Sequence, residues 1–525
     1  MRHIAAALLI PACAMLSPVA HAQFGRGNND WNTAGLDAQR SSWVHTDPKI
    51  SIESLSKPGF TITWKIALKD SKGSGSAGLP ILLNRYIGYR GFRSFAFVGA
   101  AGDNVYTVDT DLSRIEWHQH FAPSAPLPPG CSASTVPGVA RPSGTAFPAI
   151  AVGRGGGFGR GGPAHSSVGE AGEGAVTLSA GGRANAAFAP PPAYGGRAEA
   201  GRGGRAGEAG RGGRGMDNSA RRMQNSLYIL TADGILHSVW LSSGEVSEDA
   251  VKFLPPGAGA RGLILVDNVA YAATSSACGG SSGISALNLA SKEVTSWKPE
   301  GGAVVGEDGP AIGPDGTLYV ASAGGSAGVS ALEAKTLERK DWYASDSGDL
   351  ASSPVIFEYK DRALAAVASK SGKILLLDTK SLGGADHRTP LFSASTDGSP
   401  DGLASWQDAA GIRYLIAAAS GAIRSWKVVE RNGSPALEPA WTSPEIASPL
   451  APMIVNGVVF AASKGSRSSP AVLYALDATN GKALWNSGRL ITSYVADSGL
   501  SAGDTQVYLG TADGTLYAFG FPIEH

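Results

Sequence analysis

The pattern of apolar and polar residues repeats along the chain, and each copy predicts two β-strands joined by a tight hairpin. Segments 97–106 (FVGAAGDNVY), 227–236 (LYILTADGIL) and 507–516 (VYLGTADGTL) each place apolar runs on both sides of a glycine-containing turn. Asp233-Gly234 and Asp513-Gly514 favour tight hairpins, because glycine takes the positive φ angle that such turns need. A unit that recurs in this way is typical of a repeat architecture.

Each such hairpin leads through a turn to an aromatic residue. The strings are TVDTDLSRIEW (107–117), ALNLASKEVTSW (286–297), ALEAKTLERKDW (331–342) and ALDATNGKALW (475–485). A polar residue stands eight or nine positions before each tryptophan: Asp109, Asn288, Glu333 and Asp477. We expect this residue to hold the turn by bonding backbone amides, and the tryptophan to be buried between neighbouring units.

The spacing of these aromatics predicts an all-β fold, an eight-bladed β-propeller of four-stranded antiparallel blades. We expect the blades to dock through Trp64, Trp117, Trp297, Trp342, Phe392, Trp441 and Trp485. From Trp297 onward these residues are 44 to 50 positions apart, the length of one blade. A two-sheet sandwich, the alternative, would not repeat a four-strand unit with one buried tryptophan each time.

The two ends of the repeat region predict how the ring closes. The last repeat stops at Phe521, before any further tryptophan, and residues 60–68 (FTITWKIAL) form an orphan strand near the N-terminus. We expect this strand to supply the outer strand of the last blade, which removes an open sheet edge.

The first 22 residues read as a signal peptide. Residues 4–16 are mostly apolar but too short to span a bilayer, and Ala20-His21-Ala22 offers a small-x-small cleavage site. The alternative is lipidation at Cys13. No later stretch suits a membrane helix, so a periplasmic or secreted location is expected.

The domain organisation then consists of a leader (23–58) and a single propeller (59–525) that contains a Gly/Arg-rich insert (153–222). The insert carries ten arginines and five acidic residues and few residues able to form a core, so we expect disorder. Its Arg-Gly-Gly repeats also occur in RNA-binding segments, and attraction to an anionic surface is a further alternative. The formal net charge of zero gives no general field for nucleic acid, and we expect no nucleic-acid partner.

The repeats resemble those of the pyrroloquinoline-quinone (PQQ) dehydrogenases and of the outer-membrane assembly lipoprotein propeller. The leader, with Asp30-Trp31, Gly35 and Arg40-Ser41-Ser42, resembles the segment before the propeller in quinoprotein alcohol dehydrogenases. The resemblance implies PQQ above a calcium ion in the mouth of the central funnel, between a tryptophan and a disulfide of adjacent cysteines, with an aspartate as base. This chain has neither adjacent cysteines nor a C-x-x-C-H haem motif.

Acidic residues are expected just before the inner strands of several blades. The candidate ligand-binding residues are Asp308, Asp349, Asp401 and Asp497, which would ring one mouth of the funnel and bind a cation or polar ligand. The alternative is that they are ordinary solvated loop acids. No metal ligand set can be assigned.

Two cysteines remain after signal cleavage, Cys131 and Cys278. Propeller topology places them on loops that emerge on one face of neighbouring blades. Because thiols in an oxidising compartment usually pair, we expect a Cys131–Cys278 disulfide.

The sequence leaves two functions open. The first is a non-catalytic binding or assembly scaffold in the cell envelope, a monomer that holds a protein or other ligand at a propeller face, with no catalytic residues and no cofactor. The alternative is a divergent PQQ-dependent alcohol or sugar dehydrogenase that uses PQQ and calcium. The fold does not separate them.

Overall fold

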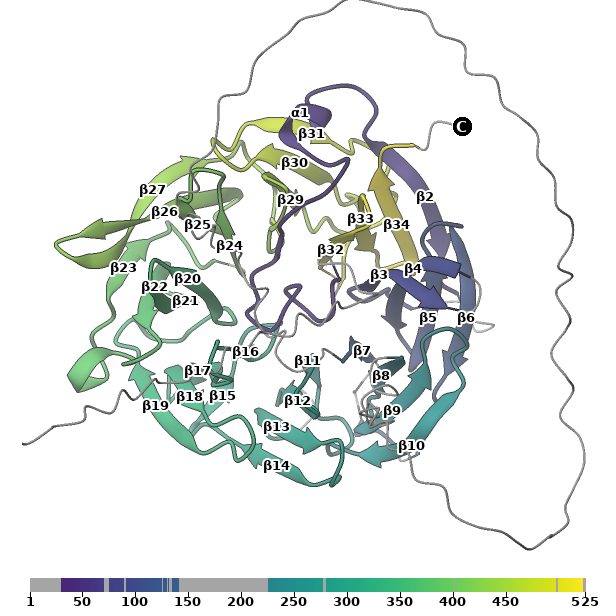
Figure 1. Cartoon of the computed structure of the whole chain (residues 1–525), viewed down its shortest axis with the longest axis horizontal. Helices are drawn as coiled ribbons and strands as arrows, with labels where there is room; N and C mark the ends of the chain where they lie inside the picture. Colours follow the sequence, from purple (N-terminus) through teal and green to yellow (C-terminus); the bar gives the residue numbers. More distant parts are fainter. Residues whose placement is uncertain are drawn as a thin grey trace, which may run out of the picture. The chain divides into compact units, whose positions relative to one another are not determined.

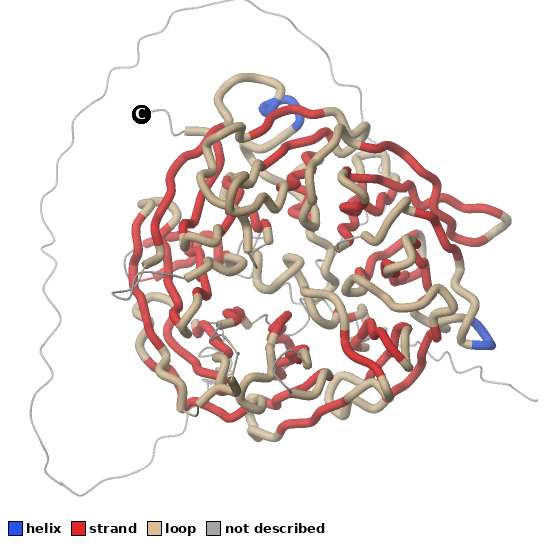
Figure 2. The backbone as a smooth tube through the Cα atoms, turned by 180° about the vertical axis from the view of Figure 1, so that it is seen from behind, coloured by secondary structure: helices blue, strands red, loops and turns tan. Residues whose placement is uncertain are grey.

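The computed structural model describes residues 30–69, 75–88, 91–124, 126–129, 131, 135–140, 225–276, 280–400, 402–496 and 499–522. Within these residues the strands form eight sheets arranged around a ring, as Figure 1 shows from one side and Figure 2 from behind. We number the sheets as blades 1 to 8 in chain order. The predicted eight-bladed propeller is confirmed.

In blades 1 to 4, each chain segment runs from an inner to an outer strand by antiparallel pairing. Blade 1 contains β3 (Ile81–Gly88), β4 (Gly91–Ala100), β5 (Asn104–Asp109) and β6 (Arg114–His120). Blade 2 contains β7 (Val136–Val139), β8 (Ser226–Leu230), β9 (Ile235–Trp240) and β10 (Val246–Lys252). Blade 3 contains β11 (Arg261–Val266), β12 (Val269–Thr274), β13 (Gly283–Asn288) and β14 (Val294–Trp297). Blade 4 contains β15 (Gly302–Val304), β16 (Ala311–Ile312), β17 (Leu318–Gly324), β18 (Gly328–Leu332) and β19 (Arg339–Ala344).

Blades 5 to 8 follow the same plan, with two strands supplied by the N-terminal region. β1 adds a fifth strand to blade 7, and β2 is the fourth strand of blade 8. Blade 5 contains β20 (Val355–Tyr359), β21 (Arg362–Ser369), β22 (Lys373–Asp378) and β23 (Phe392–Ser395), with the 3₁₀ turn η1 (Gly384–Asp386). Blade 6 contains β24 (Leu403–Gln407), β25 (Arg413–Ala419), β26 (Ala422–Arg431) and β27 (Ser434–Thr442). Blade 7 contains β28 (Met453–Val455), β29 (Val458–Ala462), β30 (Leu473–Asp477) and β31 (Ala483–Asn486), with β1 (Trp43–Val44) parallel to β28. Blade 8 contains β32 (Leu500–Gly503), β33 (Gln506–Gly510), β34 (Thr515–Gly520) and, from the N-terminal side, β2 (Thr61–Ala67).

The strand β2 closes the ring as the sequence predicts. It pairs antiparallel with β34 from Thr61 opposite Gly520 to Ala67 opposite Thr515. The short helix α1 (Ile52–Leu55) precedes it. Blade 8 is therefore built from both ends of the propeller region, and β34 has no open edge.

The hairpins between second and third strands confirm the expected turn chemistry. The Thr231 hydroxyl lies 2.6 Å from Asp233 Oδ1 and donates over 3.0 Å to the Ile235 carbonyl. The equivalent distances from Thr511 in blade 8 are 2.7 and 3.0 Å. Gly234 follows Asp233 with φ near +83°, a conformation that glycine adopts without a steric penalty. The same four-residue string therefore forms the same turn in two blades.

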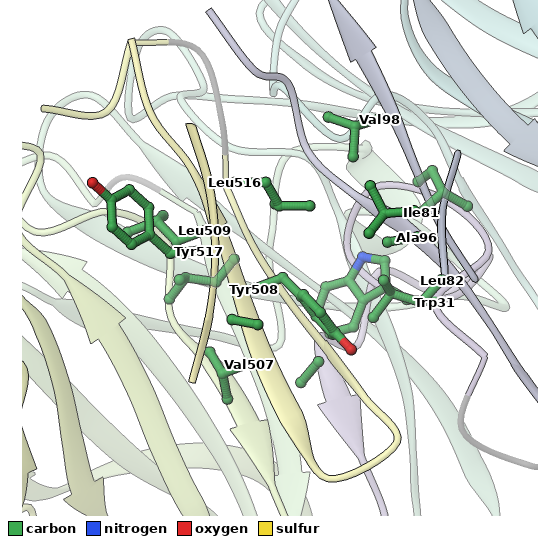
Figure 3. Packing of buried hydrophobic residues seen from close by; sticks show 14 of the residues in the cluster. Trp31, Ile81, Leu82, Ala96, Val98, Val507, Tyr508, Leu509, Leu516 and Tyr517 are labelled. Atoms are coloured by element: carbon green, nitrogen blue, oxygen red, sulfur yellow. The ribbon is translucent and has the colours of Figure 1, made fainter. Parts of the chain in front are cut away.

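The hydrophobic core lies between blades. Strands packed on both faces are expected to be apolar throughout, and β25 is buried along its whole length. Separate clusters of buried side chains fill the seams between blades 2 and 3, 3 and 4, 4 and 5, 5 and 6, and 6 and 7. The largest cluster joins blades 7, 8, 1 and 2, and Figure 3 shows Trp31 within it beside Leu82 of blade 1 and Tyr508 of blade 8.

The seven expected docking aromatics all lie on outer strands of blades, and two of them dock identically. Trp117 Nε1 donates over 2.9 Å to the Leu241 carbonyl of blade 2, and Trp441 Nε1 donates over 2.9 Å to the Ala478 carbonyl of blade 7. Each indole lies against a glycine of the same loop: a Cβ on Gly244 would approach Trp117 to 2.7 Å. The indole thus occupies space that only glycine leaves free.

The other five aromatics make more varied contacts. Trp485 lies edge-on to Phe60 at 4.9 Å, and Trp64 lies 5.8 Å from Tyr508. Trp297 packs on the cluster between blades 3 and 4, and Arg431 of blade 6 lies over Phe392. Trp342 is 38% exposed and stacks on His387 of blade 5 at 3.8 Å.

Several sequence-based predictions fall outside the described residues, and they stay predictions. They are the signal peptide, the lipidation alternative at Cys13, and the disordered insert at 153–222, which lies between β7 and β8. Within the described part, no helix has the length and apolar character to cross a membrane.

Candidate functional site

The central channel of the propeller holds the chain's own residues 30–47, which we call the channel segment (Figures 1 and 2). It visits the blades in order, one after another. The bonds to blades 1 to 4 run from Leu82 N to Trp31 O (2.8 Å), Val139 N to Asn32 O (3.4 Å), Thr33 Oγ1 to Leu263 O (2.7 Å) and Ile312 N to Ala38 O (2.7 Å). Those to blades 5 to 8 run from Ile356 N to Gln39 O (2.9 Å), Ser405 N to Ser41 O (3.0 Å), Ile454 N to Ser42 O (2.8 Å) and Thr505 N to Asp47 Oδ2 (3.2 Å).

Two tryptophans anchor the channel segment. Trp31 is 1% exposed and Trp43 is 8% exposed. A tryptophan buries about 150–250 Å², worth roughly 4–6 kcal/mol at about 25 cal/mol per Å² before the entropy of ordering is subtracted. The two side chains therefore supply much of the free energy that fixes the segment in the channel.

The backbone of the channel segment is held in an unusual conformation. Leu36, Arg40 and Ser42 have φ angles of 75°, 61° and 51°. Non-glycine residues rarely adopt such angles, and each costs about 1–3 kcal/mol unless the surroundings impose it. The blades, rather than local preference, determine the shape of this segment.

Arg40 is fully buried, with no exposed surface. Its Nε donates to Pro310 O over 2.9 Å and its Nη2 donates to Gly262 O over 3.1 Å, so it bonds blades 4 and 3. Its Nη1 donates to Thr33 Oγ1 over 2.9 Å and to the Ala34 carbonyl. Among side chains, only the planar guanidinium presents N–H donors that point in these several directions within one plane.

Burial lowers the pKa of Arg40 to about 10, and the carboxylates of Asp308 and Asp37 act against that shift. Arg40 therefore stays charged at neutral pH. Asp308, a predicted ligand-binding residue, lies in the break between β15 and β16, inside the inner edge of blade 4. The structure makes it a counter-charge to the channel segment, which sequence reasoning missed.

A second contact region surrounds Trp43. His45 stacks on its ring at 3.7 Å, and the guanidinium of Arg413 lies 5.4 Å from the ring centroid. Burial lowers the pKa of His45, and the nearby positive charge of Arg413 lowers it further, while Asp37 acts in the opposite direction. His45 is therefore neutral at physiological pH. A neutral imidazole avoids charge repulsion with Arg413, which contacts the same Trp43 ring.

The acidic residues at the predicted mouth are joined to basic partners. Asp349 Oδ1 accepts from Gly324 N over 2.7 Å, and its Oδ2 lies 3.3 Å from Lys370 Nζ. Both contacts lower the pKa of Asp349, and the hydrogen bond from the Gly324 amide has the larger effect. Similar pairs join Arg261 to Glu307 (3.0 Å) and Arg424 to Asp397 (3.1 Å). Asp401 and Asp497 lie outside the described residues.

The donor set of the described mouth does not fit the calcium ion that the resemblance implies. Calcium takes six to eight oxygen ligands that converge on one point. No group of three or more His, Cys, Asp or Glu side chains among the described residues is placed to hold a metal ion. Asp349 already accepts a hydrogen bond from an amide and pairs with a lysine, and the charge of Asp308 acts on Arg40. We therefore derive no catalytic step through PQQ or calcium.

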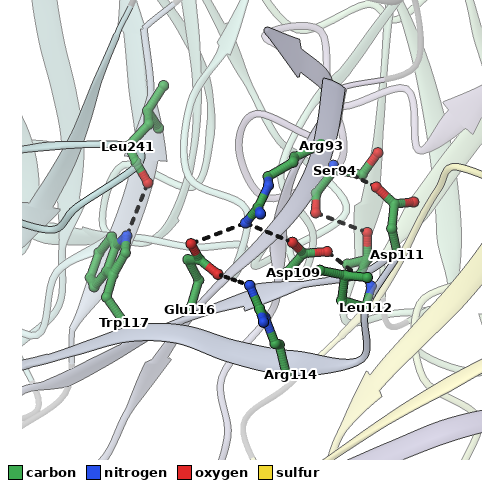
Figure 4. A network of polar contacts seen from close by, with 10 residues as sticks. Arg93, Ser94, Asp109, Asp111, Leu112, Arg114, Glu116, Trp117 and Leu241 are labelled. Atoms are coloured by element: carbon green, nitrogen blue, oxygen red, sulfur yellow. Dashed lines mark hydrogen bonds and ion pairs between the residues drawn. The ribbon is translucent and has the colours of Figure 1, made fainter. Parts of the chain in front are cut away.

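A polar network at the seam between blades 8 and 1 adds a further group of carboxylates (Figure 4). Arg93 Nη1 lies 3.0 Å from both Asp109 and Glu116, and Asp111 Oδ2 accepts from Ser94 N. Burial and the neighbouring carboxyl of Asp504 raise the pKa of Asp111 to about 6. Arg93, Ser94, Asp109, Asp111 and Glu116 all belong to blade 1, so these contacts join its outer strands and turn and are structural.

Cys131 is disulfide-bonded in the structure and lies on the connection from blade 1 to blade 2, where sequence reasoning places it. The other cysteines, Cys13 and Cys278, lie outside the described residues. The Cys131–Cys278 pairing therefore stays a prediction.

Known structures with this architecture include quinoprotein dehydrogenases. The chain superposes on the quinohemoprotein alcohol dehydrogenase from Comamonas testosteroni with a TM-score of 0.54 and 13% identity, covering 94% of this chain and 81% of that one. For a europium-containing methanol dehydrogenase the values are 0.53 and 11%, covering 94% and 98%. BamB from Moraxella catarrhalis gives only 0.39 at 16% identity, covering 57% and 81%. No protein-family model and no curated protein sequence matches the chain.

At these identities the likeness establishes the fold alone. The chain has the eight-bladed propeller of the quinoprotein dehydrogenases, as the repeats indicate. Activity has to be argued from the channel and its mouth.

Proposed function

We propose that this chain is a non-catalytic scaffold in the cell envelope that binds a protein or other ligand at a propeller face. The observation that carries the proposal is the occupied channel: residues 30–47 bond to all eight blades in the space around which a propeller usually builds its site. A second support is that the mouth carboxylate Asp349 pairs with Lys370 and that the charge of Asp308 acts on the buried Arg40. The expected signal peptide favours a periplasmic or secreted location.

The alternative is a divergent PQQ-dependent dehydrogenase, and the shared fold is the observation that favours it. Hydride removal by a quinone needs a cofactor fixed within reach of a base. The contacts of Asp349 with Gly324 N and Lys370 argue against the role of base for this residue.

One experiment separates the two functions. Purified mature protein is incubated with PQQ and calcium, the quinone absorbance is recorded, and dye reduction is followed with alcohols and aldoses. We expect no retained quinone and no reduction above the background of PQQ alone. Saturable reduction that needs added PQQ, is lost in Asp349→Ala and persists in the exposed-turn control Asp361→Ala would overturn the scaffold role.

A positive test uses a photo-crosslinking amino acid introduced at an exposed mouth position, Glu307, whose side chain is 87% exposed. We expect one discrete protein adduct in cells, reproduced when the adduct partner is purified and mixed with the protein. The matched control places the same amino acid at Lys57 in the linker before β2, which is 66% exposed. Equal labelling at both positions would contradict recognition at the propeller face.

A further inference from the structure

The channel segment has the composition of a bound peptide. Eight of its polar side chains are at most 8% exposed: Asp30, Asn32, Thr33, Asp37, Gln39, Arg40, Ser41 and Ser42. An ordinary core strand of this propeller, such as β25, is apolar after its first two residues, Arg413 and Tyr414. A segment so rich in polar groups stays soluble when it is exposed. Most of its hydrogen bonds to the inner strands are made by its main chain, as when a sheet binds the backbone of a peptide.

The connection between the channel segment and the ring is exposed in its middle part, whereas Ile50, Leu55 and Phe60 of the same stretch are buried. Residues 48–60 lead from the channel to β2, and two side chains of this linker, Glu53 and Lys57, are 82% and 66% exposed. A cut after Lys57 therefore separates the channel segment and β1 from β2, and it leaves every blade with its four antiparallel strands.

The shape of the segment depends on the channel. The positive φ angles of Leu36, Arg40 and Ser42 are not ones that a free peptide holds. The segment therefore orders only as it docks, and that ordering opposes its affinity. A ligand of this kind exchanges more readily than a core strand of equal length.

We propose that the channel is a peptide-binding site whose resident ligand is residues 30–47, and that it accepts peptides that fold into the same turns and carry an arginine and two tryptophans at the spacing of Trp31, Arg40 and Trp43. Arg40 determines specificity, because it bonds the carbonyl oxygens of Pro310 and Gly262 on two blades together with Thr33 and Ala34 of the segment itself. Lysine offers three donors on one tetrahedral nitrogen and does not reproduce that arrangement. This proposal goes beyond the scaffold role, and its test has a different readout.

The experiment uses the full mature chain with a protease recognition sequence inserted after Lys57. The uncut variant is first shown to have the thermal midpoint of the wild type. After cleavage, the resident fragment is held only by non-covalent contacts. A fluorescent synthetic peptide of residues 27–49 is added, its anisotropy is followed, and near-ultraviolet circular dichroism reports whether the ring stays folded.

We expect the native-sequence peptide to enter the cleaved protein while the ring stays folded. A peptide with Arg40→Lys should bind at least about tenfold more weakly, and a scrambled peptide of the same composition should not bind. Uncut protein is the matched control and should take up little peptide, because the tethered segment competes at high effective concentration. Release of the resident fragment only on global unfolding, failure of the native peptide to enter, or equal uptake of the scrambled peptide would each overturn the proposal.

Discussion

Two buried charges of this chain differ in how well their surroundings satisfy them. Each of the three guanidinium nitrogens of Arg40 donates a hydrogen bond to an acceptor. Asp103, in the hairpin between β4 and β5, is fully buried, and only its Oδ1 has a partner within the described residues, Ala232 N of blade 2 at 3.1 Å. Burial raises the pKa of Asp103 from 3.8 to about 6, and the nearby charge of Asp233 adds to the shift. A buried group with an unpaired oxygen prefers to keep its proton.

This preference predicts a pH-dependent effect of Asp103→Asn. Because the folded-state pKa is raised, the stability that the protonated carboxyl provides is present below pH 3.8 and is lost as the pH rises through about 6. Asparagine keeps an acceptor for Ala232 N, tolerates the left-handed backbone of residue 103 (φ 54°) and never ionises. The variant should equal the wild type near pH 4 and be more stable at pH 8, by up to roughly 3 kcal/mol.

The measurement is the urea midpoint of wild type and variant at a series of pH values. Asp361→Asn, in the exposed turn between β20 and β21, serves as control and should show no pH-dependent difference. A variant that is less stable than the wild type by the same amount at every pH would contradict the assignment.

At the scale of elements, the outer strand of one blade docks on the loop of the next through its tryptophan. Trp117 combines burial, an indole hydrogen bond to Leu241 and a glycine that leaves room for the ring. Trp342 occupies the equivalent position in blade 4, but the loop of blade 5 offers it His387, and 38% of its surface stays exposed. The same sequence signal thus produces two docking strengths.

We therefore predict that Trp117→Ala destabilises the protein much more than Trp342→Ala. Truncation of Trp117 removes apolar contact and the indole hydrogen bond, and it leaves a cavity. Together these losses should lower the free energy of unfolding by about 3–5 kcal/mol. At the exposed site water fills the space, and the cost should be about 1 kcal/mol. Urea denaturation of both variants measures the difference, and Trp117→Phe, which keeps the ring but loses the bond to Leu241, should lie between them. Equal costs at the two sites would show that spacing alone sets the docking energy.

At the scale of the whole molecule, the repeats made the ring predictable, but not its centre. Blade number and the closing role of β2 follow from local patterns: alternating apolar runs, Asp-Gly turns and regularly spaced tryptophans. The channel segment has no such pattern, because its bonds go to strands far apart in the chain, from Leu82 to Thr505. The resemblance of the leader to the segment before quinoprotein propellers included Trp31 and Arg40, but it did not predict that these residues lie in the channel. The positions of the acidic residues before the inner strands suggested a ring of carboxylates at the mouth. The positive charges near Asp308 and Asp349, on Arg40 and Lys370, lie elsewhere in the sequence and could be recognised only in the three-dimensional structure.

Ring closure by β2 is the property on which the whole molecule depends, and a single proline tests it. Leu68 N donates to Gly514 O over 2.7 Å, and because amide directions alternate along a strand, Ile66 N also faces β34, opposite Leu516. Ile66→Pro removes that donor and should cost about 1–3 kcal/mol beyond the loss in the matched control Ile66→Ala, which truncates the side chain but keeps the amide. Because loss of pairing exposes the edge of β34, the proline variant should also form dimers or larger species by edge-to-edge pairing. Urea denaturation and size-exclusion chromatography with light scattering check both effects. If the proline and alanine variants have the same midpoint and both remain monomeric, then β2 covers blade 8 without closing the ring, and the other contacts of the N-terminal region, including those of the channel segment, hold blades 8 and 1 together.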